Sequence, residues 1–419
     1  MSTNIQKNQI TEGIIWRQLL LFFFPILLGT FFQQLYNTID SVIVGQFVGK
    51  EALAAVGGSS AQIVAFVVGF FTGLSSGASV TIAQFFGAKD SRSANKGLHT
   101  AYAIAAFGGL ILTVSGIILT PFLLEMMNTP ADIVADSAVY LRIYFAGIIF
   151  VLIYNMGSAI LRATGDSKRP LYYLIVCCII NIVLDVLFVI VFHMGVMGVA
   201  VATLIAQAVS AVLVTLKLMR SEGILKLSVK QIRFHGSILK MQLKLGLPTG
   251  FEAILFSITN IAIQSAVNTF GTDTTAAWSA YGKLDAIFWM VSTAFGIAIT
   301  TFVGQNYGAG KMDRVRKSTR VCLLMDFIVS AVLVVFLIAA RFLLFRLFTN
   351  DSHVIEIGCD MLVLITPWYI VYVFIEVIAG ALRGVGNVVV PVAITLLGVC
   401  VLRIAWLAAM LKISPTISA

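Results

Sequence analysis

Long apolar stretches follow one another along the chain, and short polar segments separate them. Each stretch is about 20 residues long, enough for an α-helix to cross the roughly 30 Å of bilayer hydrocarbon. The short alternating segments typical of a membrane barrel are absent from the sequence. The pattern predicts an all-α polytopic membrane protein with eleven spans at roughly 19–44, 52–76, 97–120, 139–161, 171–193, 197–218, 241–268, 275–301, 318–341, 361–382 and 389–411.

Composition excludes a soluble protein. The 419 residues are 59% hydrophobic and only 11% charged, whereas a soluble globular chain carries roughly 25% charged residues. The first apolar stretch has no small-residue cleavage site and continues into further spans, so it is a transmembrane helix and not a signal peptide.

Cysteine and histidine give no sign of a metal or redox site. The five cysteines form no CxxC pair, and the four histidines form no HExxH motif. We therefore expect packing roles for the cysteines, no cofactor, and no enzymatic activity.

Basic residues are distributed unevenly between the loops. Of the 28 Lys and Arg, 21 lie in the amino-terminal segment or in the loops that follow even-numbered spans. The positive-inside rule places these segments in the cytoplasm, so we expect a multi-pass protein of the cell membrane with a cytoplasmic amino terminus. The net charge of +9 is then mostly loop charge that faces anionic lipid, and no nucleic-acid partner is expected.

The chain contains an internal repeat with an offset of 221 residues. The segment "AQFFGAKDSRSANK" (83–96) aligns with "GQNYGAGKMDRVRK" (304–317), and "LRATGDSKRP" (161–170) aligns with "LRGVGNVVVP" (382–391). Six spans separate the two copies, so both begin on the cytoplasmic side and form parallel repeats.

The repeat predicts three segments. These are an amino-terminal six-helix lobe at 1–217, a basic cytoplasmic linker at 218–240, and a carboxy-terminal lobe at 241–419. Two six-span halves would make twelve spans, but the second half shows five and stops at "ISPTISA" (413–419). We therefore expect the twelfth to be missing, either because the chain is truncated or because the last helix is lost.

No energy-coupling domain accompanies the two halves. The nearest approach to a phosphate-binding loop, "GQNYGAGK" (304–311), is one residue too long, and Met312 stands where a Ser or Thr would bind Mg²⁺. The organisation favours a secondary transporter with two helical bundles around a central axis.

Six carboxylates fall inside the predicted spans, where ionisable groups are costly and usually functional. They are Asp40, Asp185, Glu252, Asp285, Asp326 and Glu376.

Two of these acids are peculiar to the first half. Asp185 and Asn181 align with Trp406 and Leu402 of the second half. Asp40 aligns with Ile263 after the two-residue slip that also pairs Pro25 with Pro248. A polar group needed only for the fold would be expected in both copies. The first half is therefore predicted to hold a specialised polar site.

Helical geometry places several polar groups at the depth of Asp40. Asn181 and Asp185 are four residues apart and share one helix face. Thr203 lies in the outer half of its span, Tyr36 is one turn from Asp40, and Tyr140 opens its span from outside. Oxygen groups of these types suit Na⁺ and can also hold a proton. Asp40, Asn181, Asp185 and Thr203 are thus candidate ion ligands, and hydrogen bonding between helices is the alternative.

The second half has a different set of acids. Glu252, Asp285 and Glu376 lie near the middle of their spans, and Glu376 aligns with Asn155 of the first half. Lys283 is predicted to be buried nearby, with Glu252 as its partner. Structural ion pairing between helices is the alternative for these acids, and we expect Asp326 to be structural.

Several motifs at the repeat spacing resemble the multidrug and toxic compound extrusion (MATE) family. They are "QQLYNTIDSVIVGQFVGKEALAAVG" (33–57), "GLSSGASVTIAQFFGAKD" (73–90) and "GALRGVGN" (380–387). The resemblance runs from about residue 10 to residue 411. It implies two lobes arranged as a V around a central cleft, and export of organic, mostly cationic drugs in exchange for H⁺ or Na⁺ by alternating access. We expect a monomer in the lipid bilayer.

The resemblance also implies site residues. In the branch with archaeal and DNA-damage-inducible members, the ion-coupling positions fall here on Tyr36, Asp40, Tyr140, Asn155, Asn181, Asp185 and Thr203. Another branch uses acids of the carboxy-terminal lobe, in the spans that hold Glu252, Asp285 and Glu376. With Lys283, these three are our candidate substrate-binding residues.

Three other classes of function are alternatives: a flippase, an intramembrane enzyme and a channel, although a channel would not need a two-lobed repeat with isolated carboxylates. A lipid-linked oligosaccharide flippase of the same broad architecture would need several intramembrane cations to hold pyrophosphate, but the clear case here is Lys283 alone. An intramembrane enzyme would show a motif such as HExxH or GxGD; the sequence has no HExxH, and "ATGDS" (163–167) lacks the first glycine of GxGD. Drug export is therefore the preferred interpretation.

Overall fold

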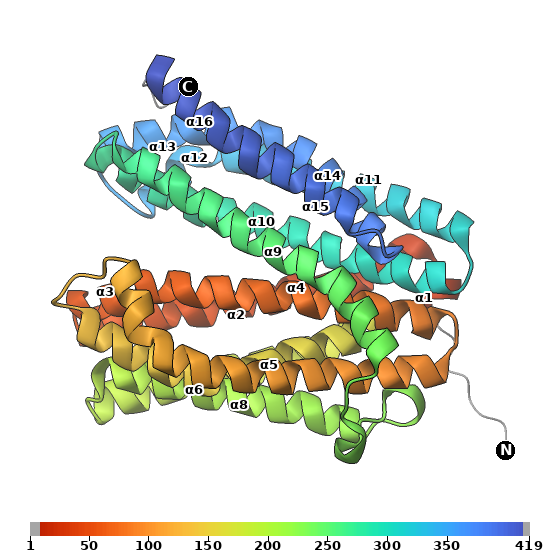
Figure 1. The fold of residues 1–419 in the computed structure, drawn as a ribbon. Coiled ribbons are helices and arrows are strands. Elements are labelled where there is room, and N and C mark those ends of the chain that lie inside the picture. The colour runs from red at the N-terminus through yellow and green to blue at the C-terminus, as the bar shows by residue number, and fades with distance from the viewer. Residues whose placement is uncertain (1–8, 414–419) are drawn as a thin grey trace. The chain divides into compact units, whose positions relative to one another are not determined.

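The computed structural model describes residues 9–413. Lys7, which contributes to the amino-terminal charge, and residues 414–419, which bear on the predicted loss of a twelfth span, lie outside the described residues. All regular secondary structure within residues 9–413 is helical (Figure 1). Within this described range, eleven segments are long and apolar enough to cross a membrane. The predicted all-α polytopic fold is confirmed.

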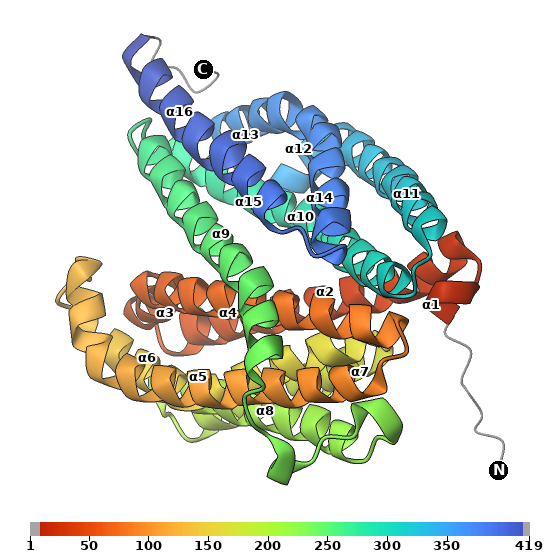
Figure 2. The same cartoon turned by 45° about the vertical axis from the view of Figure 1, so that its right-hand side comes forward.

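The helices group by their contacts into two compact units, and the first comprises Phe24–Phe251. Within it, helix α6 packs against α4, α5 and α8, and the long helices run side by side (Figures 1 and 2). The helices that belong to it in full are α3 (Lys50–Gly57), α4 (Ser59–Gly87), α5 (Ser91–Met126), α6 (Val134–Ala163), α7 (Lys168–Asp185), η1 (Val186–Val191), α8 (Gly195–Met219), η2 (Gly223–Leu225) and η3 (Val229–Gln231).

The second unit comprises the described residues before Phe24 and after Phe251. Its centre is α10, which packs against α11, α13 and α14. The helices that belong to it in full are α1 (Gln9–Glu12), α10 (Thr272–Gly308), α11 (Met312–Ala339), α12 (Arg341–Arg346), α13 (Ser352–Ile365), η4 (Thr366–Trp368), α14 (Tyr369–Gly384), α15 (Val389–Thr395), η5 (Leu396–Val401) and α16 (Leu402–Ile413).

Two helices pass from one unit to the other. They are α2 (Ile15–Phe47) and α9 (Gly236–Asn268), and their boundaries lie at residues 23/24 and 251/252. Each contains a proline within three residues of that boundary, Pro25 and Pro248. Proline has no N–H group, so each helix lacks one backbone hydrogen bond there. The predicted division at 1–217, 218–240 and 241–419 follows the sequence repeat and stays a prediction.

The backbone reproduces the 221-residue repeat. Helices α4 and α10 end at residues 87 and 308, and α5 and α11 begin at residues 91 and 312. Helices α6 and α14 end at residues 163 and 384, and α7 and α15 begin at residues 168 and 389. The predicted duplication is therefore present in the helix boundaries themselves.

Turn geometry is repeated as well. Gly165 and Gly386 take φ values of 96° and 90°, and Lys89 and Gly310 take 58° and 71°. In the last pair a lysine occupies the left-handed region that favours glycine, because a side chain is crowded by the backbone there. The surrounding structure thus maintains the turn even though Lys89 stands where the second copy has Gly310.

The amino-terminal segment is fixed to the second unit by side-chain donors. Both Nε and one Nη of Arg314 donate to the carbonyl of Ile10, at 3.0 and 2.9 Å. Lys311 donates to the carbonyl of Thr11 at 3.0 Å, and Arg314 also bonds the carbonyl of Gly13. We call these contacts the amino-terminal attachment. They hold the start of α2 on the turn between α10 and α11.

The first copy of the repeat lacks these donors. The positions equivalent to Lys311 and Arg314 are Asp90 and Ser93. Asp90 instead caps α5, since its carboxylate accepts from the Ser93 N–H at 3.0 Å. That backbone hydrogen bond holds the pKa of Asp90 below its usual range. One turn geometry therefore serves two different purposes.

The linker lies against α5. Asn95 Nδ2 donates to the carbonyls of Ile224 and Lys226, both at 3.1 Å. The buried His99 accepts the N–H of Ser228 on Nε2 at 3.0 Å, and its Nδ1 lies 2.8 Å from the carbonyl of Asn95. The linker between the two halves is thus bonded to the first unit before α9 begins.

Glycines allow α4 and the first part of α9 to approach closely. Gly73 and Gly77 are four residues apart on α4, and Gly246 and Gly250 have the same spacing on α9. A Cβ atom added to Gly77 would lie only 2.7 Å from the Cα of Gly246. Paired small residues of this kind let membrane helices pack backbone against backbone.

Candidate functional site

Four polar side chains from three helices meet inside the first unit. Asp40 of α2 lies beside Asn181 and Asp185 of α7 and Thr203 of α8. Asn181 Nδ2 donates to Thr203 Oγ1 at 3.5 Å. All four side chains are buried, and Asp185 is 0% exposed. The structure therefore brings together the four residues that the sequence placed at one depth, and we call them the first-half cluster.

Most oxygens of this cluster lack a donor. Among the described residues, neither carboxylate oxygen of Asp185 has a hydrogen-bond partner, and the same holds for Asp40 Oδ1 and Asn181 Oδ1. Two adjacent buried carboxylates repel each other when both are ionised, and a buried charge without a partner is costly. A proton or a cation between them would remove both penalties.

The possible ligand atoms of the first-half cluster suit a small cation better than a transition metal. Within the described residues no group of three or more His, Cys, Asp or Glu could hold a metal ion. Two carboxylates, an amide oxygen and a hydroxyl are instead hard oxygen ligands, which suit alkali cations. The cluster can equally bind a proton on either carboxylate.

A second set of polar groups borders the cluster. Gln207 of α8 donates from Nε2 to the hydroxyl of Tyr36 at 3.3 Å, and both residues are buried. Tyr36 and Tyr140 are within electrostatic range of Asp40. Sequence reasoning missed Gln207, although its position four residues after Thr203 puts it on the same helix face.

Asn155 does not join this group. It is half-buried on α6, and no hydrogen bond within residues 9–413 links it to Asp40 or Asp185. Its proposed role in ion coupling rests on the family resemblance.

The helix that carries Asp185 changes its winding directly after this residue. Helix α7 ends at Asp185, and the π-helical segment η1 follows. Single π-helical turns within α-helices occur often at functional sites. This change of winding marks the place where the backbone next to Asp185 departs from regular α-helix.

The second unit contains a buried ion triad. Arg383 lies 3.6 Å from Glu252 and 3.6 Å from Glu376, and the three side chains are 16%, 11% and 15% exposed. The hydroxyl of Tyr372 donates to Glu376 Oε2 at 3.3 Å. We call these three residues the second-half triad. It carries one formal negative charge.

Gly296 makes room for the triad. A Cβ atom at this position of α10 would collide with the carboxyl group of Glu376. The carboxylate can therefore lie directly against the α10 backbone. Packing between α10 and α14 thus fixes the position of Glu376.

Aromatic side chains surround the third acid of this unit. Trp289 Nε1 donates to Asp285 Oδ2 at 2.7 Å, and the hydroxyl of Tyr369 donates to its other oxygen. The Tyr369 ring stacks on Phe288 at 4.2 Å, and the Trp289 ring meets that of Tyr372 at 4.6 Å. The aromatic residues thus connect Asp285 with the neighbourhood of Glu376.

One predicted pairing is wrong. Lys283 is exposed on α10, and Glu252 pairs with Arg383 instead. The prediction paired Glu252 with Lys283 because Lys283 lies inside a predicted span and, two residues before Asp285, cannot share its helix face. Arg383 reaches back from the last turn of α14, as long arginine side chains can.

Comparison with known proteins decides the family. The MatE family model matches residues 25–187 and, a second time, residues 248–407. The chain belongs to the MATE family of membrane transporters. The double match agrees with the internal repeat and with the resemblance seen in the sequence motifs.

Curated MATE relatives cover most of the chain. It is 30% identical over 393 residues to the "Probable multidrug resistance protein YoeA" of Bacillus subtilis, a match that spans 92% of this chain and 84% of the relative. It is 27% identical over 412 residues to the "Probable multidrug resistance protein NorM" of Thermotoga maritima, which spans 96% of this chain and 86% of that protein.

Solved MATE structures share the fold. An outward-facing MATE multidrug resistance transporter superposes with a TM-score of 0.87 at 22% identity, covering 94% of this chain and 88% of the other. A transporter of the MOP superfamily from Pyrococcus furiosus gives a TM-score of 0.88 at 21% identity, covering 98% and 92%. At these identities the likeness concerns the fold alone.

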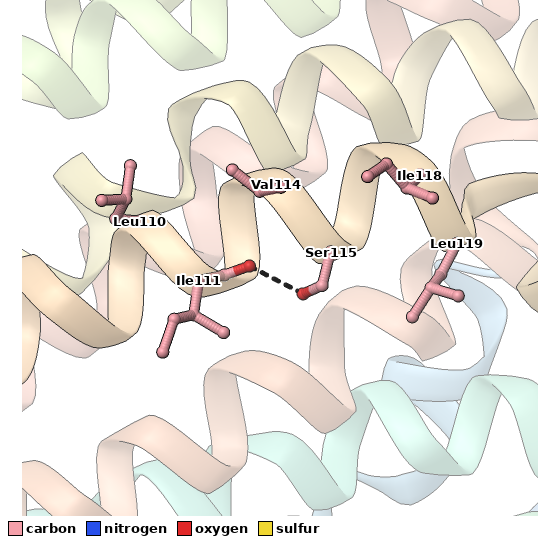
Figure 3. A pocket seen from close by; sticks show the side chains of 6 residues that line it. All are labelled: Leu110, Ile111, Val114, Ser115, Ile118 and Leu119. Carbon is pink, nitrogen blue, oxygen red and sulfur yellow. Dashed lines mark hydrogen bonds between the residues drawn. The ribbon is translucent and has the colours of Figure 1, made fainter.

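A shallow hollow on α5 is not part of the candidate MATE site. Figure 3 shows its lining, Leu110, Ile111, Val114, Ser115, Ile118 and Leu119, all from one helix. The only hydroxyl there, that of Ser115, donates to the carbonyl of Ile111 at 2.8 Å. The leucines and isoleucines of this face are exposed, as expected where a membrane helix meets lipid.

Proposed function

We propose that this protein is a secondary active multidrug exporter, which releases organic, mostly cationic compounds in exchange for H⁺ or Na⁺. The observation that carries the proposal is the first-half cluster, where two buried carboxylates lie together and most of their oxygens lack donors. Its counterpart positions in the second half are apolar. The names of the curated relatives support drugs as substrates.

Exchange requires that ion and drug favour different conformations. A ligand that binds both states equally well shifts no equilibrium. In the proposed cycle, an ion in the first-half cluster cancels the repulsion between Asp40 and Asp185 and stabilises one conformation. The organic cation stabilises the other. The cytoplasmic amino terminus and the cell membrane, both expected from loop charge, give this cycle its direction.

The second unit supplies the groups for the organic cation. Glu252, Asp285 and Glu376 provide negative charge, and the rings of Trp289 and Tyr372 lie close to two of these acids. Aromatic faces attract cations, with a contribution of about 0.5–2 kcal/mol per contact. A site of this kind recognises charge and flat apolar area, and it would accept many different cations.

Imposed gradients test the proposed function directly. In proteoliposomes of the purified protein, a ΔpH or a Na⁺ gradient, applied separately, should drive ethidium across the membrane. An ionophore that collapses the effective gradient should stop the transport. If ethidium distribution responds to neither gradient, ion-coupled export is wrong.

Neutral amides test the role of the second-half acids. Glu252→Gln, Asp285→Asn and Glu376→Gln should each weaken export of ethidium about tenfold, which corresponds to roughly 1.4 kcal/mol of lost charge interaction. Export of an uncharged dye should change far less. Glu356→Gln, at an exposed position on α13, is the matched control. Equal export of both dyes by all three variants would mean that these acids serve only the fold.

A further inference from the structure

One buried acid remains outside the groups described so far. Asp326 lies on α11 and is 0% exposed. It is in the middle of the stripe of residues that α11 buries in its own unit, Val315, Ser318, Cys322, Asp326, Ser330, Val334 and Leu337. A carboxylic acid at the centre of such a stripe needs a chemical explanation, because an apolar or small residue would pack there at no electrostatic cost.

The contacts of Asp326 do not neutralise a charge. The hydroxyl of Ser330 donates to Oδ1 at 3.1 Å. Oδ2 has no hydrogen-bond partner among the described residues, and no Lys, Arg or His there forms an ion pair with this carboxylate. A fully buried carboxylate without a counter-charge takes up a proton rather than remain ionised.

Asp326 lies near the second-half triad. Its electrostatic neighbours are Glu376 on α14 and, on its own helix, Cys322. The thiol of Cys322 points to the carbonyl of Phe295 at 4.0 Å, and the carboxyl of Glu376 lies against the next residue of α10, Gly296. Cys322, one turn before Asp326, and Glu376 therefore approach the same turn of α10, where that helix presents backbone and no charge of its own.

Charge balance connects the two acids. Glu252 and Glu376 together exceed the charge of Arg383 by one negative unit. Ionised Asp326 would raise the excess to two in a low-dielectric core. A cation bound at Glu252 and Glu376 would cancel one unit, and ionised Asp326 would then be less costly.

We propose that Asp326 is a proton-binding site of the second half, which holds a proton while the triad is free and releases it when an organic cation binds there. The step is an exchange of one bound proton for one bound cation, and the proton leaves to the solvent. The inference rests on the proposed function, since it takes Glu252 and Glu376 as part of the cation site. It adds a proton site in addition to the first-half cluster.

Proton release on cation binding tests the proposal. The purified protein would carry Asp40→Asn and Asp185→Asn, so that the first-half cluster contributes no proton. Tetraphenylphosphonium would be added in weakly buffered solution with a pH indicator. We expect about one proton released per bound cation. With Asp326→Asn added, the cation should still bind and this release should disappear.

The matched control is Asp313→Asn, at an exposed position in the first turn of the same helix. It should leave the release unchanged. Proton release that persists with Asp326→Asn overturns the proposal and leaves the proposed function intact. Absence of any cation binding to the wild-type chain overturns both.

A second measurement covers the case in which Asp326→Asn does not fold. Infrared difference spectra of the protein that carries only Asp40→Asn and Asp185→Asn should show the carbonyl band of a protonated carboxylic acid, and tetraphenylphosphonium should remove it. A spectrum in which cation binding removes no such band overturns the proposal.

Discussion

Asp40→Asn should reduce gradient-driven export of ethidium to the background of empty liposomes. The substitution keeps the shape of the side chain, but an amide can neither take up a proton nor carry the negative charge that attracts Na⁺. Asn181, Asp185 and Thr203 remain in place, so the helices should still pack. Transport in proteoliposomes measures the effect, and thermal unfolding of the purified protein verifies the fold.

Two further variants serve as a test of the partner carboxylate and as a control. Asp185→Asn should lose nearly as much transport, because the two carboxylates act as a pair. Asp132→Asn, an exposed acid before α6, should export like the wild type. Full export by folded Asp40→Asn protein would show that coupling lies elsewhere. The remaining candidates would then be the acids of the second half, Glu252, Asp285, Asp326 and Glu376.

Arg383→Met should lower the stability of the protein more than any other single change considered so far. It leaves Glu252 and Glu376 without their shared counter-charge in a site where the three side chains are at most 16% exposed. Removal of one member of a buried ion pair typically costs about 3–5 kcal/mol, because the other charge stays buried. The midpoint of thermal unfolding in detergent measures the loss.

Compensating changes separate charge from packing. Adding Glu252→Gln and Glu376→Gln to Arg383→Met should restore most of the lost stability, since no unpaired charge remains. Arg316→Met, at an exposed position of α11, should shift stability by no more than about 0.5 kcal/mol. Unfolding of Arg383→Met at the wild-type temperature would show that the triad does not stabilise this unit.

Prediction from the sequence was most successful for features that depend on a single helix. The spans follow from apolar length, which has one physical cause, the thickness of the bilayer. The pairing of Asn181 with Asp185 on one face follows from the four-residue spacing within α7. Comparison of the two repeats then identified Asp40 as a functional candidate, because the equivalent residue of the second half, Ile263, is apolar.

The sequence did not predict which helices contact one another. Periodicity shows which residues share a face, but it does not show which neighbouring helix that face meets. For this reason Glu252 was assigned to Lys283, although its partner is Arg383. For the same reason the sequence did not predict that α2 and α9 are each divided between the two units. This division depends on tertiary contacts such as the stacking of Phe23 on Phe295 at 4.0 Å.

The amino-terminal attachment bears on how a duplicated protein of this kind can diverge. Both copies keep the same turn, yet Lys311 and Arg314 bind the chain's own beginning, while Asp90 and Ser93 close a helix end. A dimer of two identical first halves would reproduce the turns but would have no side chains to hold either amino terminus. In a single chain the two turns need not carry the same residues, so the attachment can be asymmetric.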